Sequence, residues 1–328
     1  NGTGAQTIGG TGSIEFSGAG NQNFVTYSSG TPTLTLGNGV TVNTLAGGNF
    51  WNDGLAWTLN GAFNVNAPSA TVTTNVASIT RGGLSTVNVQ AGTLRLNGAN
   101  GDIDYNGTWD IASGATLNLN HSGTRTLDAG FLATGSGSIS NQSGTLNING
   151  MGNTTAGFAQ AGGGTINFDS AISIGALDVS STVNINAAVS SGGLNFTTGT
   201  LTGAGNLTLS GASTWSGGTM SGTGTTTIAS GATLDISGAA FKTINTRLLD
   251  NYGTINWSGT GAIQLMNSQA VYGDNAIRNQ AGGLFDAQSD ANFSYGGGQT
   301  NFNNIAGTFR KSGGTGTTTS TPYFINTG

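Results

Sequence analysis

One segment of this sequence occurs twice. Residues 228–236 read Ile-Ala-Ser-Gly-Ala-Thr-Leu-Asp-Ile, and residues 111–119 differ from them only at the last two positions, where Asn and Leu stand. Each copy is a tight Ser-Gly corner followed by alternating polar and apolar residues. This alternation predicts a short β-strand with Leu234 and Ile236 on one face and Thr233 and Asp235 on the other. So short a unit cannot bury its apolar face alone, so we expect neighbouring units to stack.

The composition fits many short strands joined by turns. Glycine accounts for 59 of the 328 residues without a Gly-X-Y period, and only three residues are proline, which excludes collagen and argues against a Pro/Gly-rich disordered segment. Charged residues make up 6% of the chain, against a typical ~25%. The surface must therefore consist mainly of Thr, Ser, Asn and Gly. The net charge of −5 and only eight basic residues argue against nucleic-acid binding.

Further strands and corners of the same kind fill the chain. Apolar-polar-apolar triplets recur at 14–16, 34–36, 94–96, 146–148, 177–179, 194–196, 207–209 and 255–257. Corners that begin with asparagine precede several strands, at Asn141, Asn251, Asn279 and Asn304. Asn and Gly tolerate positive φ, so we expect these corners to use it. The glycine- and threonine-rich run 313–319 resembles a linker, but apolar residues on both sides of it predict a further coil.

These observations predict an all-β fold, a right-handed parallel β-helix (β-solenoid) with about three short strands per coil and no significant helix. Related strands lie roughly 17 to 29 residues apart, which suits one coil better than the hairpins of a sandwich or a propeller. Residues 241–249 are the best candidate for one or two helical turns. No shift in composition marks a boundary, so residues 1–328 are expected to form one continuous solenoid, uncapped at both ends.

The units at 141–148 and 229–236 resemble the long repeat regions of bacterial surface exoproteins. These include filamentous-haemagglutinin-like adhesins and the passenger regions of autotransporters. The resemblance covers nearly the whole chain and rests on short motifs and compositional style. It implies a parallel β-helix, export to the cell surface and a structural or adhesive role, and it carries over no catalytic residues.

Asp102, Asp104 and Asp110 are the best candidates for a metal site. Asp102 and Asp104 would share one face of a strand, and Ca²⁺ prefers six to eight oxygen ligands. The alternative is a solvated turn, which we favour because the glycine-rich repeat of calcium-binding β-rolls is absent. The chain has no cysteine, so thiolate metal sites and thiol catalysis are excluded. No cofactor other than this weakly indicated Ca²⁺ is expected.

Asp286 and Asp290 are the candidates for catalysis. Two carboxylates beside one corner could serve a polysaccharide lyase or hydrolase, provided that they converge. His121 is the only histidine, and neither a zinc site nor a catalytic triad with Asp128 has a supporting motif. We expect His121 to be a surface turn residue.

Aromatic residues gather at 50–63, away from the strand pattern. Trp51 and Trp57 could stack against a glycan or a partner, or they could form a local satellite core. Trp109 and Trp257 occupy inward strand positions and are expected to pack in the core. Threonine-rich segments at 31–35, 71–74 and 223–227 also suggest an ice-binding array, but they do not repeat from coil to coil.

Neither terminus shows a polar or helical cap, although a solenoid exposes unpaired strand edges at its ends. The expected stacking surfaces contain Ile8, Ile14 and Phe16 at one end and Tyr323, Phe324 and Ile325 at the other. We therefore expect a non-enzymatic structural protein outside the cell, stacked end to end in a filament or long surface fibre.

The stacking partner would be a second copy, head to tail, or an adjoining segment of a longer chain. Neither nucleic-acid binding nor membrane insertion is expected. The alternatives are an adhesin that binds glycans or surfaces through residues 50–63, and a polysaccharide-cleaving β-helix.

Overall fold

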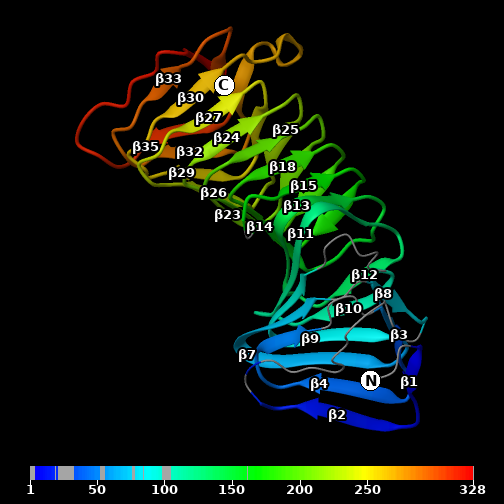
Figure 1. The fold of residues 1–328 in the computed structure, drawn as a ribbon. Coiled ribbons are helices and arrows are strands. Elements are labelled where there is room, and N and C mark those ends of the chain that lie inside the picture. The colour runs from blue at the N-terminus through cyan, green and yellow to red at the C-terminus, as the bar shows by residue number, and fades with distance from the viewer. Residues whose placement is uncertain are drawn as a thin grey trace. The chain divides into compact units, whose positions relative to one another are not determined.

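The fold is described from a computed structural model, which covers residues 4–18, 20, 33–51, 56–75, 78–83, 85–97, 105–160 and 162–327. It contains 59% strand and 1% helix, and parallel coils form a β-solenoid of about 13 turns, so the predicted fold class is confirmed (Figure 1). The chain divides into two compact units, Asn1–Gly164 and Thr165–Gly328. Each unit is described by itself.

In the first unit, parallel strands pair in register with the coils before and after them. The strands of one sheet are β1 (Gln6–Ile8), β3 (Thr33–Leu36), β6 (Ala56–Leu59) and β8 (Ser78–Arg81). The remaining strands are β2 (Gly12–Phe16), β4 (Val40–Thr44), β5 (Gly48–Trp51), β7 (Ala62–Asn75), β9 (Thr86–Asn97), β10 (Gly107–Ile111), β11 (Thr116–Leu127), β12 (Phe131–Thr134), β13 (Ser138–Ile148) and β14 (Gly157–Gln160). The long strands β7, β9, β11 and β13 each serve two faces, with register shifts where they bend.

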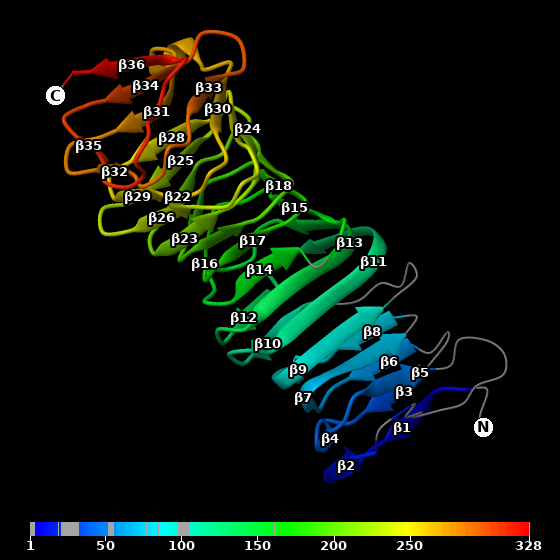
Figure 2. The same ribbon diagram turned by 90° about the vertical axis from the view of Figure 1, so that its left-hand side faces the viewer.

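The second unit repeats three strands per coil (Figure 2). One face contains β17 (Leu177–Val179), β20 (Leu194–Phe196), β23 (Ala212–Trp215), β26 (Thr233–Ile236), β29 (Thr254–Trp257), β32 (Leu284–Ala287) and β35 (Thr308–Lys311). The next contains β15 (Thr165–Phe168), β18 (Thr182–Ile185), β21 (Thr200–Thr202), β24 (Gly218–Ser221), β27 (Lys242–Asn245), β30 (Ile263–Met266) and β33 (Phe293–Tyr295). The third sheet, in order, contains β16 (Ile172–Ile174), β19 (Val189–Ser191), β22 (Leu207–Leu209), β25 (Thr225–Ile228), β28 (Leu248–Asn251), β31 (Asn275–Asn279), β34 (Asn301–Asn304) and β36 (Tyr323–Asn326).

The alternation of side chains builds the core. Leu234 and Ile236 are fully buried. Thr233, which precedes them, and Asp235, which lies between them, face outward, as the sequence predicts. Parallel in-register pairing places each inward residue directly over its equivalent in the neighbouring coil, for example Ile255 over Leu234. The interior is therefore a column of stacked apolar side chains, each of which contributes roughly 1.5–3 kcal/mol when buried. Trp109 and Trp257 lie in this interior, as predicted.

The helical prediction for residues 241–249 is wrong. These residues contribute to β27 and β28, with Lys242 and Ile244 pointing inward and Thr243 outward. β27 pairs in register with β24 on one side and β30 on the other, so the backbone N–H and C=O groups form their hydrogen bonds within the sheet and need no helix. The one helix of the described residues is η1 (Ala270–Tyr272), a single 3₁₀ turn in the corner between β30 and β31, and it is too short to cross a membrane.

Three of the four asparagine corners use positive φ, as expected, but not at the asparagine itself. Positive φ falls at Gly144, Gly282 and Ala306 in these corners, and not at the asparagines that open them. In the second unit the side chains of Asn251, Asn279 and Asn304 are buried. The hydrogen bonds of their buried amide groups are described in the next subsection.

Candidate functional site

A ladder of asparagine side chains runs along the third sheet of the second unit. Nδ2 of Asn251 donates to Oδ1 of Asn279 at 2.8 Å, Nδ2 of Asn279 donates to Oδ1 of Asn304 at 2.7 Å, and Nδ2 of Asn304 donates to Oδ1 of Asn326 at 2.9 Å. All three bonds point toward the C-terminal coil. A carboxamide has two N–H donors, so each asparagine has a second hydrogen to place.

The second hydrogen goes to a backbone carbonyl near the corner. Nδ2 of Asn251 donates to the carbonyl of Leu284 at 3.0 Å, and Nδ2 of Asn279 donates to the carbonyl of Thr308 at 3.0 Å, both in the coil that follows. Asn326 lies in the last coil and accepts from Asn304, but no acceptor among the described residues contacts its own Nδ2. Within the described residues the last member of the ladder is thus an exposed asparagine with a donor group to place.

A column of phenylalanine rings ends at the same coil. Phe302 is fully buried and stacks on Phe324, with ring centroids 5.0 Å apart and planes 12° apart. Phe309 meets Phe324 edge to face at 5.0 Å. Phe324 lies in register with Phe302 and therefore belongs to the core column, yet it is 42% exposed. Its exposure arises because β36 is the last strand of its sheet and no coil lies on its outer side among the described residues.

A hollow of about 760 Å³ opens beside this exposed core. Its lining includes Asp274, Tyr295, Asn301, Tyr323 and Phe324. Tyr295 is in register with the buried Leu265, so its ring occupies a core position although it is largely exposed. The hollow thus lies beside the last described coil and borders both the exposed Phe324 and the outward-facing Asn301 and Tyr323.

Of the predicted stacking residues at this end, Phe324 alone lies on a core column. Tyr323 is in register with Asn301, and Ile325 with Asn303, and these partners alternate with the inward-facing Phe302. Tyr323 is 78% exposed. At the other end, Ile8, Ile14 and Phe16 are all in register with buried residues, namely Leu36, Val42 and Thr44, and are only half-buried.

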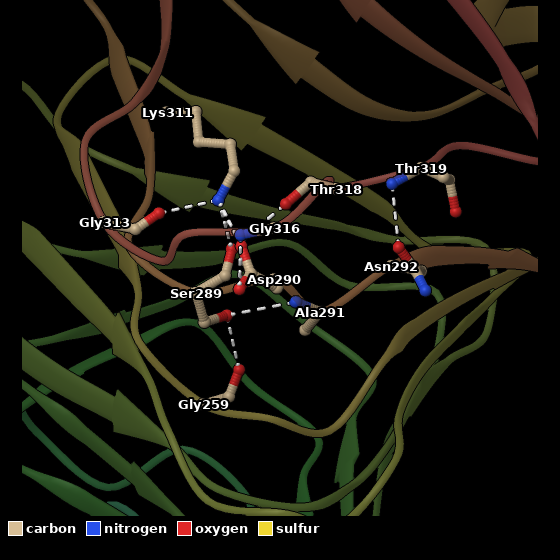
Figure 3. Close-up of polar contacts among 10 residues, drawn as sticks. All are labelled: Gly259, Ser289, Asp290, Ala291, Asn292, Lys311, Gly313, Gly316, Thr318 and Thr319. Atoms are coloured by element: carbon tan, nitrogen blue, oxygen red, sulfur yellow. Dashed lines mark hydrogen bonds and ion pairs between the residues drawn. The ribbon is translucent and has the colours of Figure 1, made fainter.

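A polar cluster holds the last long corner in place (Figure 3). Nζ of Lys311 lies 2.7 Å from Oδ1 of Asp290 and also donates to the carbonyls of Ser289 and Gly313. The backbone N–H of Gly316 donates to Oδ2 of Asp290 at 2.9 Å. The hydrogen bonds from Lys311 and Gly316 lower the pKa of Asp290. The run 313–319 is therefore a tethered corner that leads into β36, and the predicted further coil is confirmed.

Asp286 is engaged in an ion pair of its own. It is 1% exposed, and Nη2 and Nε of Arg310 in the next coil lie 2.6 Å and 3.2 Å from its two oxygens. Gln288 adds a hydrogen bond at 3.0 Å. The bond with Arg310 holds the pKa of Asp286 well below its usual range. Asp286 and Asp290 thus each have their own cation, and no contact of the described residues joins the two carboxylates.

The other predicted sites lie elsewhere. Asp102 and Asp104 fall outside the described residues, and Oδ1 of Asp110 accepts from Thr134 at 2.8 Å. Among the described residues no group of three or more His, Cys, Asp or Glu could hold a metal ion. Nδ1 of His121 accepts from the backbone N–H of Gly123 at 2.8 Å, at a bend of β11.

The structure describes only some side chains of the aromatic patch at residues 50–63. The backbone of Trp51 belongs to β5, and its side chain is outside the described part. Trp57 is 3% exposed and packs edge to face on Phe63 with ring centroids 6.2 Å apart. A sugar could not stack on a ring so deeply buried, so the position of Trp57 fits the alternative that it packs in a local core.

A row of threonines does repeat from coil to coil, but it comprises other residues than those in the threonine-rich segments. Thr165, Thr182, Thr200, Thr219 and Thr243 are aligned on the outward face of five successive strands. The separation between neighbours changes from coil to coil because the corners differ in length, so no fixed sequence period reveals the row. β-Branched residues suit such half-exposed strand positions.

In comparisons with known proteins, no family model, no curated sequence and no solved structure matches this chain. The site must therefore be interpreted from its own geometry.

Proposed function

We propose that this protein is a structural, non-enzymatic β-solenoid that forms part of a filament or long surface fibre outside the cell, stacked end to end. In this proposal the exposed C-terminal coil is covered by a further coil. The observation that carries it is the exposure of Phe324 on a core column whose neighbouring member, Phe302, is fully buried. Exposed strand edges of this kind are templates for pairing with another strand.

The resemblance to filamentous-haemagglutinin-like adhesins and autotransporter passengers supports the same class of function. The low content of charged residues and the dense amide ladder suit a stiff protein in which neighbouring coils hold one another. A solenoid gains stability with each coil that is added, because each new interface buries one more layer of the core.

The test extends the full chain by one coil, by repeating residues 305–326 directly after Asn326. We expect amide hydrogen exchange of residues 321–327 to slow and the unfolding temperature to rise, because the added coil covers Phe324 and pairs with β36. Unchanged exchange of residues 321–327 in the extended chain would contradict the proposal, since the end coil would then not accept a further coil.

The catalytic alternative has a separate test. Release of reducing ends from a uronic-acid polymer, abolished by Asp286→Asn, would contradict the non-enzymatic proposal. We expect no release, because Arg310 and Gln288 occupy the oxygens of Asp286. The adhesin alternative depends on an exposed aromatic ring within residues 50–63. The tryptophan of this patch whose side chain is described, Trp57, is buried and could not contact a glycan.

A further inference from the structure

The hollow beside the corner between β33 and β34 has a volume of about 760 Å³. Pockets that bind small organic ligands have volumes of roughly 300–1,000 Å³ and combine aromatic rings with a few polar groups. Three successive coils contribute to this lining, and β34 and β36, which border it, lie side by side (Figure 2). The side chains that matter below are Asp274, Tyr295, Gln299, Asn301 and Tyr323.

A shortened corner creates this hollow. The corner between β30 and β31 spans residues 267–274, and the corner between β33 and β34 spans residues 296–300. In the following coil Ser320 bridges to Phe293, and Thr321 and Pro322 alone separate Ser320 from β36. No described residue of that coil takes a strand position over Tyr295. The hollow is therefore the space that the short corner leaves over residues 295–301.

The two tyrosines of the hollow are exposed for reasons that lie within the described coils. Tyr295 is 54% exposed because the next coil turns away from it at Thr321, and Tyr323 is 78% exposed because it faces outward, in register with Asn301. A further coil with the same two-residue corner would stack on residues 321–325 and would leave residues 295–301 uncovered. Phe324 and Ile325, which such a coil could cover, are not needed for the site.

The tyrosine rings supply flat apolar surfaces with a polar end. Trp257, Phe285 and Phe302 in the neighbouring strands are fully buried, so Tyr295 and Tyr323 are exposed aromatic groups on a surface composed mainly of Thr, Ser, Asn and Gly. A sugar ring has an apolar face of C–H bonds and a rim of hydroxyl groups. A phenol ring matches both, because its face is apolar and its hydroxyl donates and accepts hydrogen bonds.

Asp274, Gln299 and Asn301 supply polar groups around the rings. A carboxylate accepts hydrogen bonds and a carboxamide both donates and accepts them, so this set suits hydroxyl groups. The backbone at Asp274 is held in place, because its carbonyl accepts from the N–H of Asn301 at 2.8 Å. Among the described residues the carboxylate of Asp274 makes no ion pair.

The charge of the hollow narrows the class of ligand. The described lining includes one carboxylate, that of Asp274, and no basic residue. Sulfated, phosphorylated or uronic-acid ligands would be repelled by this carboxylate and would find no cation to offset it. A ligand with many hydroxyl groups and no charge fits best.

We propose that this hollow binds a short neutral oligosaccharide, with Tyr295 and Tyr323 against its sugar rings and Asp274, Gln299 and Asn301 at its hydroxyl groups. This site is separate from the aromatic patch at residues 50–63. It does not require end-to-end stacking, so it goes beyond the function proposed above.

The test screens the unmodified chain against an array of neutral oligosaccharides and measures the dissociation constant of the best ligand by calorimetry. Tyr295→Ala and Tyr323→Ala should each weaken binding about tenfold, because each removes one aromatic contact. Tyr252→Ala is the matched control, since Tyr252 is 42% exposed in the corner after β28 and lies outside this lining, and it should leave binding unchanged.

Two further variants separate binding from folding and charge from shape. Tyr295→Phe keeps the ring and should retain binding even if Tyr295→Ala lowers the unfolding temperature. Asp274→Asn keeps the size of the side chain, and it should reduce the discrimination against a sulfated form of the same oligosaccharide because the repelling charge is gone.

Three results would overturn the proposal. The first is the absence of binding to every neutral oligosaccharide at millimolar concentration. The second is binding that Tyr252→Ala weakens as much as Tyr323→Ala does. The third is tighter binding of sulfated oligosaccharides or of peptides than of neutral sugars, which would contradict the ligand class. The extension experiment on coil stacking is independent of all three, so failure of one proposal is distinguishable from failure of the other.

Discussion

Nδ2 of Asn279 lies 2.7 Å from Oδ1 of Asn304 in the next coil, and the side chain of Asn279 has no exposure to solvent. A buried amide is stable only when its hydrogen bonds are made, and here they are made to another copy of the same residue. The ladder therefore converts a polar group inside the corner into a contact that holds successive coils in register.

The first prediction compares two positions of this ladder. Asn279→Leu should lower the free energy of unfolding by about 2 kcal/mol or more, because it leaves Asn251 without its side-chain acceptor in a buried corner. Asn326→Leu should lower it by only about 1 kcal/mol or less, because Asn326 is exposed and Nδ2 of Asn304, which loses its acceptor there, keeps its bond to the carbonyl of Gly307. Urea denaturation of both variants measures the difference. Equal losses would mean that the ladder does not act through burial.

The second prediction concerns Arg247, which is 1% exposed and reaches across neighbouring coils. Its guanidinium donates to the carbonyls of Gly203, Gly205, Ser221 and Thr225 and to the hydroxyl of Thr226. Arg247→Ala should destabilise the protein by about 3 kcal/mol or more, because several buried acceptors lose their donors together.

Arg247→Lys is the matched control for charge. It keeps the cation but offers three donors in place of five, so it should restore only part of the loss. Full restoration in thermal unfolding would show that charge, and not the number of hydrogen bonds, is what the corner requires.

The third prediction concerns acid. The pKa of Asp286 is lower in the folded protein than in the unfolded chain, chiefly through the bond from Arg310. Its contribution to stability is therefore complete above the unfolded value of about 3.9 and is lost as the pH falls toward the lower folded value. Between pH 5 and about pH 3, the unmodified protein should lose more stability than Asp286→Asn does, as measured by urea titration. The same slope in both proteins would contradict this role.

The fourth prediction concerns Lys242, an inward-facing lysine whose Nζ donates to the carbonyl of Gly238 at 2.9 Å. Burial lowers its pKa below 10.5, so the folded state binds its proton less tightly than the unfolded chain does. Stability should consequently rise with pH from the lowered pKa up to about 10.4. Lys242→Met should remove this rise and be at least as stable at neutral pH, since it retains the packing without the charge. A large loss of stability in Lys242→Met would contradict the prediction.

The strand pattern could be predicted from the sequence because alternation is a local property. Leu234 and Ile236 point inward whatever coil lies above them, since a strand has period two. The helical reading of 241–249 failed for the opposite reason: Lys242 and Ile244 pair with β24 and β30 in the two neighbouring coils, 24 and 21 positions away in the sequence.

Only part of the candidate site could be predicted from the sequence. The repeated asparagine corners could be seen, but local reasoning assigned them to positive φ, which the structure places on Gly282 and Ala306. The ladder itself depends on residues about 22 to 28 positions apart coming into register, as Asn251 and Asn279 do. The apolar residue two positions before each corner asparagine was the available signal, and its meaning emerges only when the coils are stacked.

The most direct test of the central claim is native-state hydrogen exchange of the unmodified protein, followed strand by strand along the third sheet of the second unit. An open end coil predicts that the amides of β28 and β31 exchange slowly, those of β34 faster, and those of β36 fastest, because β36 is the edge strand nearest to them and has no strand on its outer side among the described residues. Protection of β36 equal to that of β31 in the monomeric protein would contradict the claim that this coil is open.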